Sequence, residues 1–253
     1  MPAVEVQGLR VILGEQFALR NVSLQIQAGA RVALVGANGA GKSTLLRALA
    51  GLVRPESGEI ALHGVPLAAD PWHARRAIGF VGHQPMLYPE LTAAENLRFY
   101  ARLYGLDDIG GRVAAGLRRV DLAYRADSRV GTLSRGMLQR LALARALLHE
   151  PSILLLDEAE SGLDAVATGL LLDVLRAQAG QRTVILASHD LGFVHAAADE
   201  VLMLRAGRVA DRLHLAAHPL SWLQERYAEV LAHSTAAKPD QRQPVGAEGS
   251  RRS

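Results

Sequence analysis

The chain has no cysteine, few aromatic residues and no long apolar run among its 253 residues. The lack of cysteine excludes disulfides and thiolate metal sites, and it fits a reducing compartment such as the cytoplasm. A membrane-spanning helix needs about 20 mainly apolar residues in a row, so the sequence predicts no such helix. The first residues, Met1 to Glu5, lack the basic start and apolar run of a secretory signal, and we expect none.

A large excess of charge of one sign is also missing, because the formal net charge is only +3. Most of that excess lies in residues 234–253, where four basic residues stand against two acidic ones: Lys238, Arg242, Arg251 and Arg252 against Asp240 and Glu248. The aromatic residues do not interleave with basic ones as in a nucleic-acid groove, so we expect no nucleic-acid partner. Since 234–253 has almost no large apolar residues, we predict a disordered tail.

The most informative segment that is present fits the phosphate-binding pattern G-x-x-x-x-G-K-[ST]. It comprises Gly36, Ala37, Asn38, Gly39, Ala40, Gly41, Lys42, Ser43 and Thr44. An apolar strand-like run precedes it at 31–35, and leucines at helical spacing follow it: Leu45, Leu46, Leu49 and Leu52. In such a loop backbone N–H groups surround phosphates, Lys42 reaches the β- and γ-phosphates, and Ser43 holds Mg²⁺. A glycine-rich turn that matches by chance is far less compatible with this context.

The remaining pattern predicts an α/β fold. Alternating residues 22–27 predict a strand within a β-rich start, and residues 85–150 are mainly helical. Thr92 and Glu95 have capping-box spacing, with Leu97, Tyr100, Ala101 and Tyr104 on one face of the helix that follows. Residues 152–156 and 183–187 read as buried strands of a parallel sheet covered by helices on both faces.

Two adjacent carboxylates, Asp157 and Glu158, follow the apolar strand at 152–156. Ligands bind at the carboxyl ends of parallel strands, so we expect this pair to face the phosphate-binding loop. Asp157 suits the Mg²⁺ shell, and Glu158 suits the role of general base for an attacking water. The alternative is a pair of acids that merely caps the next helix.

With these motifs the chain resembles the ATP-binding cassette (ABC) ATPases from Val4 to Gly207. The resemblance adds, in the family's order, Gln84, the signature Leu133–Met137, the Ser161–Asp164 segment and Ser188–Asp190. It implies a P-loop NTPase (RecA-like) core with a parallel sheet, an N-terminal antiparallel β subdomain and an inserted helical subdomain. The expected boundaries are 1–233 for the ATPase domain and about 86–150 for the helical insert.

The resemblance also implies the roles of the site residues. Two copies pair head to tail, and each ATP lies between the P-loop of one copy and Ser134, Arg135, Gly136 and Met137 of the other. His189 orients water at the γ-phosphate, Gln84 reaches Mg²⁺, and Asp164 belongs to the D-loop. ATP and Mg²⁺ are the implied substrate and cofactor.

Three positions depart from the family's pattern. Arg135 and Met137 stand where glycine and glutamine are usual, and Arg135 could either attract phosphate or point to solvent. Ala159 replaces a common proline. Leu13 stands where an aromatic side chain usually stacks on adenine, so either Leu13 or Phe17 packs there. Because Lys42, Asp157, Glu158 and His189 are kept, we predict hydrolysis of ATP.

Three kinds of ABC protein are compatible with this pattern: a transporter ATPase with separate membrane subunits, a soluble ABC machine, or a binding module with little turnover. The chain has neither a second cassette nor long coiled coils, and its catalytic set is intact. We therefore expect a transporter subunit at the cytoplasmic face of the membrane, partnered by permease subunits.

A finer resemblance concerns the segments 78–85 and 91–100 and the Ser134–Met137 signature, which look like the CcmA subfamily, the haem-exporter ATPases of cytochrome c maturation. The alternative is an exporter of drugs, lipids or polysaccharides. Within the same stretch we expect Tyr88 and Tyr100 to face a membrane partner, and Phe80 with part of the Phe99/Tyr104 set to be core. We interpret His83 as a loop residue. His214 and His218 have helical spacing for a metal but lack a third ligand, and we interpret them as surface residues.

Overall fold

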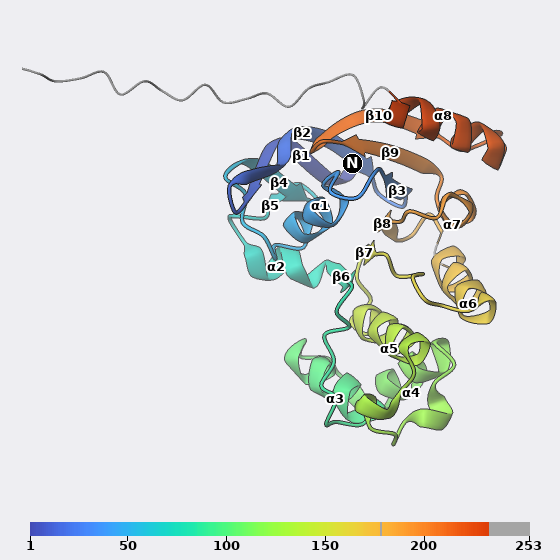
Figure 1. Cartoon of the computed structure of the whole chain (residues 1–253). Helices are drawn as coiled ribbons and strands as arrows, with labels where there is room; N and C mark the ends of the chain where they lie inside the picture. The colour runs from blue at the N-terminus through green and yellow to red at the C-terminus, as the bar shows by residue number, and fades with distance from the viewer. Residues whose placement is uncertain (178, 233–253) are drawn as a thin grey trace, which may run out of the picture.

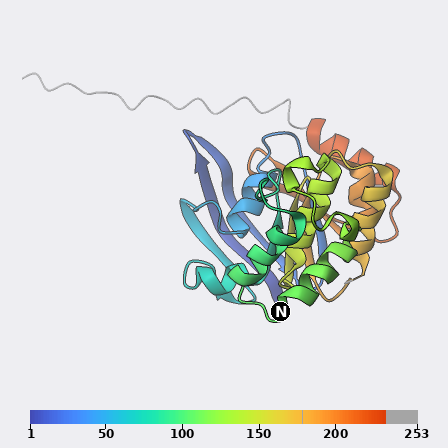
Figure 2. The same ribbon diagram turned by 90° about the horizontal axis from the view of Figure 1, so that it is seen from below.

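The computed structural model describes residues 1–177 and 179–232, which form two β-sheets with helices around them (Figure 1). The predicted tail at 234–253 lies outside the described residues. The described part of the chain contains no helix that is both long enough and apolar enough to cross a membrane. Figure 2 shows the antiparallel sheet and the C-terminal helices on opposite sides of the molecule.

The N-terminal sheet is antiparallel, as predicted, with the strand order β2-β1-β4-β5. Its strands are β1 (Pro2–Leu13), β2 (Gln16–Gln27), β4 (Ser57–Leu62) and β5 (Val65–Pro66). Along β2 the side chains at 22, 24 and 26 are buried, while those at 23, 25 and 27 are exposed. This alternation confirms the period-two pattern and places one face of the sheet on the core.

The central sheet has the order β10-β9-β3-β8-β7-β6. It comprises β3 (Arg31–Val35), β6 (Ile78–Val81), β7 (Ile153–Asp157), β8 (Thr183–Ala187), β9 (Glu200–Arg205) and β10 (Arg208–His214). Neighbours are parallel except β10, which pairs antiparallel with β9 at the edge. β3 lies between β8 and β9, so the loop after β3 emerges near the middle of the sheet's carboxyl edge.

The two faces of the central sheet bury different cores. On β7, Leu154 and Leu156 belong to one core while Ile153 and Leu155 belong to the other. The first core packs against the later helices, and the second contains α1 (Lys42–Leu49) and the antiparallel sheet. Both faces are therefore covered, one by the later helices and the other by α1 together with the antiparallel sheet.

α1 is also shorter than the leucine spacing suggested. It ends at Leu49, and Leu52 beyond it is 51% exposed. The short helix α2 (Pro71–Arg76) precedes β6 at the edge of the central sheet.

The predicted helical region lies below the central sheet in Figure 1 and contains α3 (Ala93–Leu103), α4 (Ile109–Arg119) and α5 (Arg135–Leu147), with the short 3₁₀ turns η1 (Ala123–Arg125) and η2 (Val130–Thr132). Thr92 caps α3: its hydroxyl accepts the Glu95 N–H at 3.2 Å, and the Glu95 carboxylate accepts the Thr92 N–H at 2.8 Å. The predicted capping box is confirmed. The exact boundaries 1–233 and 86–150 stay a prediction.

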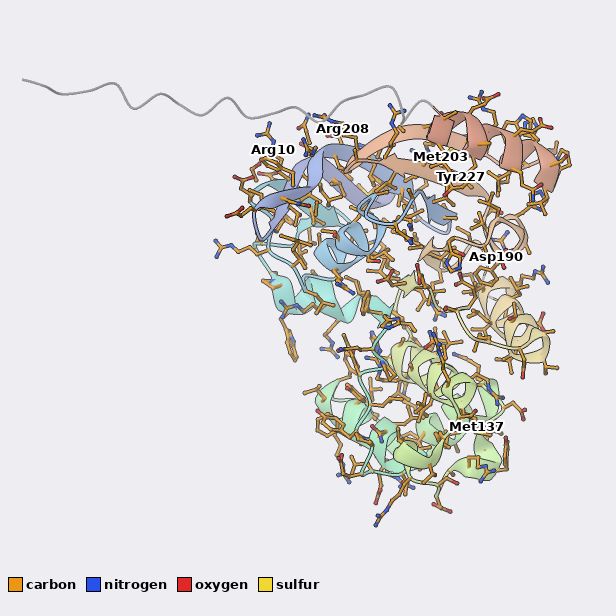
Figure 3. The ribbon with its side chains drawn as sticks, in the orientation of Figure 1. Arg10, Met137, Asp190, Met203, Arg208 and Tyr227 are labelled. Carbon is orange, nitrogen blue, oxygen red and sulfur yellow. The ribbon has the colours of Figure 1, made fainter. Side chains whose placement is uncertain are left out.

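The last helices are α6 (Ala165–Arg176), α7 (Leu191–Ala197) and α8 (Leu220–Ala232). α8 packs on β9, where Met203 and Tyr227 share a core (Figure 3). His214 is the last residue of β10, and His218 stacks on Trp222 with 3.9 Å between ring centroids. The two histidines are thus not on one helix, so the helical metal spacing suggested by the sequence does not apply. Both are exposed, in agreement with their interpretation as surface residues.

Candidate nucleotide site

The phosphate-binding loop joins the buried strand β3 to α1, as the sequence predicts. Two of its glycines are sterically required. A Cβ on Gly36 would lie 2.3 Å from the Leu204 carbonyl oxygen, and one on Gly41 would lie 2.8 Å from the Ala18 carbonyl oxygen. Gly41 also adopts φ +107° as the N-cap of α1, a conformation that favours glycine. The helix therefore starts directly behind a tight loop, so its unpaired N–H groups are available to an anion.

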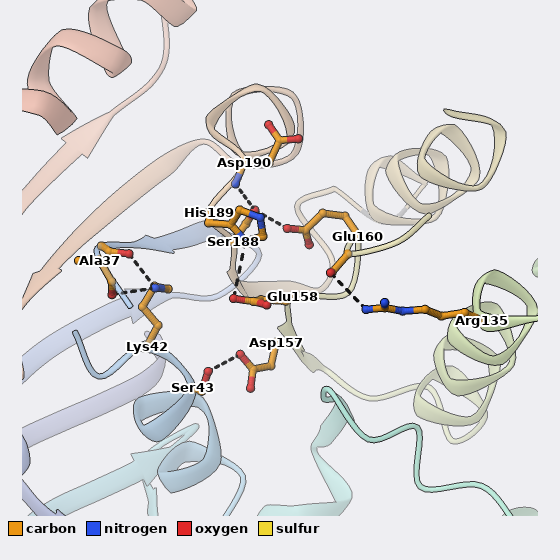
Figure 4. A network of polar contacts seen from close by, with 12 residues as sticks. Ala37, Lys42, Ser43, Arg135, Asp157, Glu158, Glu160, Ser188, His189 and Asp190 are labelled. Atoms are coloured by element: carbon orange, nitrogen blue, oxygen red, sulfur yellow. Dashed lines mark hydrogen bonds and ion pairs between the residues drawn. The ribbon is translucent and has the colours of Figure 1, made fainter. Parts of the chain in front are cut away.

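Lys42 is held within this loop. Its side chain is buried, and Nζ donates to the carbonyl oxygens of Gly36 at 2.7 Å and Ala37 at 3.2 Å (Figure 4). Burial lowers the pKa of Lys42, while the charges of Glu158 and Asp157 oppose that change. The ammonium group is thus placed at the loop where phosphates would bind.

A pocket of about 320 Å³ opens beside the loop. It is lined by residues 38–44, by Glu158 and by the adjoining ends of β1 and β2, including Leu13 and Phe17. Both side chains proposed to pack on the base therefore line the same pocket. Leu13 is 48% exposed, and Phe17 is partly buried beside Arg20. Both residues therefore stay candidates for the contact with adenine.

Ser43 and Asp157 meet at the carboxyl end of β7. The Ser43 hydroxyl donates to Asp157 Oδ1 at 2.7 Å, and Asp157 is buried. A hydroxyl and a carboxylate oxygen are hard ligands of the kind Mg²⁺ prefers. Their convergence next to Lys42 fits the predicted metal position.

Glu158 and His189 come together at the neighbouring strand ends. Nδ1 of His189 lies 3.7 Å from Oε1 of Glu158, and both side chains are accessible. Glu158 has a positive φ of 54° just after β7. For a residue with a side chain this backbone conformation is strained, and such strain gathers at functional sites. The geometry agrees with the predicted pair of a base and an orienting histidine.

The sequence did not single out a further carboxyl group at this site. Glu160 accepts a hydrogen bond from the hydroxyl of Ser188, which immediately precedes His189. The only sequence signal was the position of Glu160 two residues after Glu158.

Gln84 follows β6, the strand that pairs with β7. It lies exposed on the loop after β6, and among the described residues no hydrogen bond of its side chain is found. Its predicted contact with Mg²⁺ stays a prediction.

The signature residues lie at the start of α5. Ser134 is the N-cap, and its hydroxyl accepts the Met137 N–H at 3.3 Å. Gly136 lies in the first turn of the helix. Figure 1 shows α1, which begins in the P-loop, beside the central sheet and α5 in the helical region, and Figure 4 shows Lys42 and Arg135 on opposite sides of Glu158. One copy of the chain therefore does not bring its signature to its own P-loop.

Arg135 is exposed at the start of α5. Its side chain runs along Gly162 and donates to the Ser161 hydroxyl at 3.5 Å. The signature thus contacts the D-loop of the same copy (Figure 4). Asp164, the predicted D-loop residue, caps α6 by accepting the Ala167 N–H at 2.8 Å.

Together these groups can bind a nucleoside triphosphate and position water. The loop N–H groups and Lys42 offer positive charge to phosphates, and Mg²⁺ at Ser43 and Asp157 would neutralise further charge. Glu158 offers a carboxylate to the attacking water. This donor set suits phosphoryl transfer, which depends mainly on positioning and charge.

Comparison with known proteins agrees with this chemistry. Residues 19–161, more than half of the chain, match the ABC transporter family. The ABC transporter ATP-binding protein NatA of Bacillus subtilis (strain 168) is 38% identical over 199 residues, which cover 77% of this chain and 81% of NatA. The SkfA peptide export ATP-binding protein SkfE of the same organism is 36% identical over 218 residues, or 85% of this chain and 90% of SkfE.

The fold is likewise similar to a solved structure, described as a dimeric post-hydrolysis state of the ATP-binding cassette MJ0796 bound to ADP and Pi. The TM-score is 0.76 at 28% identity, and the match covers 85% of this chain and 99% of that one. With the family match and the similarity to nearly full-length relatives, the chain belongs to the ATP-binding subunits of ABC transporters, ATPases that couple hydrolysis to transport.

Proposed function

We propose that two copies of this chain form the ATP-hydrolysing unit of an ABC exporter, peripheral to the cytoplasmic face of the membrane, with permease subunits on other chains. The observation that carries this proposal is the separation of the P-loop and the signature within one copy. A head-to-tail pair would place each signature on the other copy's P-loop, so that ATP is contacted from both sides. The related cassette MJ0796 is described as dimeric with ADP and Pi.

The residues divide the work in this dimer. Lys42 and the loop N–H groups bind the β- and γ-phosphates, while Ser43 and Asp157 hold Mg²⁺, with Gln84 as a further ligand. Glu158 takes a proton from the attacking water and His189 orients it. Ser134, Arg135, Gly136 and Met137 contact the γ-phosphate from the partner copy, and loss of that phosphate lets the dimer open.

Molar mass in solution tests the dimer. The Glu158→Gln chain should be monomeric alone and dimeric with Mg-ATP, because slow hydrolysis keeps the bridging γ-phosphate in place. A matched Lys42→Ala, Glu158→Gln chain should stay monomeric. If Glu158→Gln stayed monomeric at saturating Mg-ATP, the proposed pairing would be wrong.

An exposed aromatic patch on the helical region supports the permease partner. It comprises Met86, Tyr88, Phe99 and Leu103, whose side chains are 40–55% exposed. Tyr88 and Phe99 contact edge to face, with ring centroids 5.0 Å apart. The buried side chain of Asn96 holds the loop by accepting the Tyr88 N–H at 2.8 Å and donating to the Tyr88 carbonyl at 3.0 Å.

This patch corrects one expectation about the partner site. Tyr100 is partly buried and donates to the Met86 carbonyl oxygen at 2.6 Å, while Phe99 is 40% exposed. Phe80 and Tyr104 are partly buried, as expected of core residues, and Tyr104 stacks on His149. Tyr88 and Phe99 are therefore the pair proposed to contact the permease.

Replacement of the exposed pair tests the docking proposal. Phe99→Glu or Tyr88→Glu should reduce recovery of this chain with its membrane partners at least about tenfold, because a buried charge in an aromatic contact is costly. Tyr124→Glu is the matched control, since Tyr124 is 63% exposed elsewhere in the helical region. Equal recovery of all three variants would contradict the docking site.

For the cargo, we propose haem export in cytochrome c maturation. The support is the resemblance of segments 78–85 and 91–100 and of the signature to the CcmA subfamily. SkfE, by contrast, is named for peptide export, so a different exported cargo is the second candidate. Purification of tagged Glu158→Gln from native membranes decides between them: cytochrome c maturation proteins with haem support the first, and an unrelated permease supports the second. Recovery with no membrane protein would favour a soluble ABC machine.

A further inference from the structure

A second carboxyl group lies next to the hydrolysis site, on the turn between β7 and α6. Glu160 is partly buried and accepts a hydrogen bond from the Ser188 hydroxyl (Figure 4). Ser188 has no exposed surface, and its oxygen also accepts the Asp190 N–H at 3.0 Å. The turns after β7 and β8 are thereby tied together through one hydroxyl.

The hydrogen-bond roles in this link are fixed by chemistry. A serine hydroxyl has one proton to donate and two lone pairs that accept. Because Ser188 gives its proton to Glu160, its lone pairs remain for the Asp190 N–H. Without the Glu160 acceptor the proton would have to point elsewhere in a site that water does not reach, which is unfavourable.

His189 lies between the two tied residues. The link fixes the backbone on both sides of His189, while the imidazole itself is 63% exposed and lies 3.7 Å from Glu158. Asp190 is fixed from its other side as well, because its carboxylate accepts the N–H groups of Gly192 at 2.8 Å and Phe193 at 3.0 Å. Glu160 therefore helps to hold the backbone from which the imidazole projects.

The charges around Glu160 fit a holding role. Burial raises the pKa of Glu160, while the hydrogen bond from Ser188 and the charge of His189 lower it, and the nearby Glu158 raises it further. Glu158 lines the nucleotide pocket, whereas Glu160 is not among its lining residues and accepts the Ser188 hydroxyl.

We propose that Glu160 is a positioning residue of ATP hydrolysis, which acts through Ser188 to hold the 188–190 turn so that His189 and Glu158 face the same γ-phosphate. This inference rests on the proposed roles of Glu158 and His189. It assigns Glu160 no contact with ATP, and it predicts an effect on turnover and not on nucleotide affinity.

Steady-state ATP hydrolysis tests the proposal with five chains besides wild type: Glu160→Leu, Glu160→Gln, Ser188→Ala, the double variant Glu160→Leu with Ser188→Ala, and the control Glu225→Leu at an exposed position of α8. Glu160→Leu and Ser188→Ala should each lower kcat about 10- to 100-fold, the range expected when a catalytic group is misplaced, with the KM for ATP unchanged. The double variant should be no slower than either single one, since both break the same link. Glu160→Gln should keep most of kcat, because its amide oxygen can still accept the Ser188 proton. Glu225→Leu should match wild type.

Three results would overturn the inference. They are a wild-type kcat in Ser188→Ala, losses that multiply in the double variant, or a raised KM with unchanged kcat. Should Glu160→Leu fail to fold, Ser188→Ala and Glu160→Gln still decide. Parallel assay of Glu158→Gln separates the two proposals: normal turnover of Glu158→Gln contradicts the proposed site itself, whereas a slow Glu158→Gln beside a normal Ser188→Ala contradicts only the role of Glu160.

Discussion

Side chains from α1, from the end of β7 and from the turn after β7 converge at the nucleotide site, and each has a distinct local cause. Lys42 is directed back onto its own loop because α1 starts there, while Ser43 meets Asp157 because β3 and β7 end at the same edge of the sheet. Glu158 follows with a strained backbone. The site is thus built from strand ends and requires no long-range rearrangement within one copy.

The most specific prediction at this scale concerns Glu158. Glu158→Gln should lower kcat at least about 100-fold, as expected for loss of a general base, while ATP binding measured by equilibrium titration stays close to wild type. Glu225→Gln provides a matched change on an exposed surface. A Glu158→Gln enzyme that turned over ATP at the wild-type rate would remove Glu158 from the role of base.

The motif residues could be identified from the sequence because their spacing is local. The P-loop, Asp157 and Glu158 each follow a strand whose apolar residues reveal it. Contacts between loops that are distant in the sequence could not be predicted. The hydrogen bond of Glu160 with Ser188 joins residues 28 positions apart, and the contact of Arg135 with Ser161 joins residues 26 apart. Both depend on how neighbouring turns pack, which no periodicity encodes.

At the scale of elements, α3 shows how far periodicity reaches. Leu97 and Ala101 are fully buried, and Tyr100 shares their side of the helix, as the spacing predicted. Tyr100 is partly buried against the core, although the expectation was an exposed side chain at a partner site. Phe99 lies on the other side and is exposed. The helical phase was a better guide than the chemistry of the side chain.

The capping box of α3 predicts a measurable stability effect. Thr92→Ala should lower the free energy of unfolding by about 1 kcal/mol, the usual cost of losing an N-cap oxygen, and Thr92→Ser should restore most of it. Urea denaturation of the three chains measures this. Equal stability of Thr92→Ala and wild type would show that the cap contributes nothing here.

His149, which follows α5, predicts that the stability of the fold depends on pH. Burial lowers the pKa of His149 to about 4, and nearby arginines, Arg145 first among them, act in the same direction, while the hydrogen bond to the Ile78 carbonyl opposes them. Because the folded pKa lies below the unfolded value, the unfolded chain binds the extra proton between pH 6.5 and 4. Stability is therefore lost as the pH falls through that window, by up to about 3 kcal/mol.

His149→Gln removes the group that titrates between pH 6.5 and 4. The glutamine amide can still donate to the Ile78 carbonyl. The stability difference between wild type and His149→Gln, from urea unfolding at pH 7 and pH 4, should shift against wild type at the lower pH. His83→Gln, on an exposed loop, serves as the control. A difference that did not change with pH would contradict the burial argument.

At the scale of the whole molecule, the P-loop and the signature occupy separate regions of the chain. The P-loop lies on the central sheet beside the antiparallel strands, and the signature starts α5 in the helical region. A site that needs both groups requires a second copy. The order of motifs along the sequence implied this through family resemblance, but only the fold shows that one copy keeps the two groups apart.

Disulfide trapping tests this central claim most directly, because the chain has no native cysteine. Asn38→Cys on one Glu158→Gln chain and Ser134→Cys on another place single thiols on the exposed P-loop and signature. Mixed with Mg-ATP and a mild oxidant, they should form a cross-linked heterodimer that is absent without ATP. No ATP-dependent cross-link between the two chains, together with a cross-link inside a chain carrying both cysteines, would contradict the composite site.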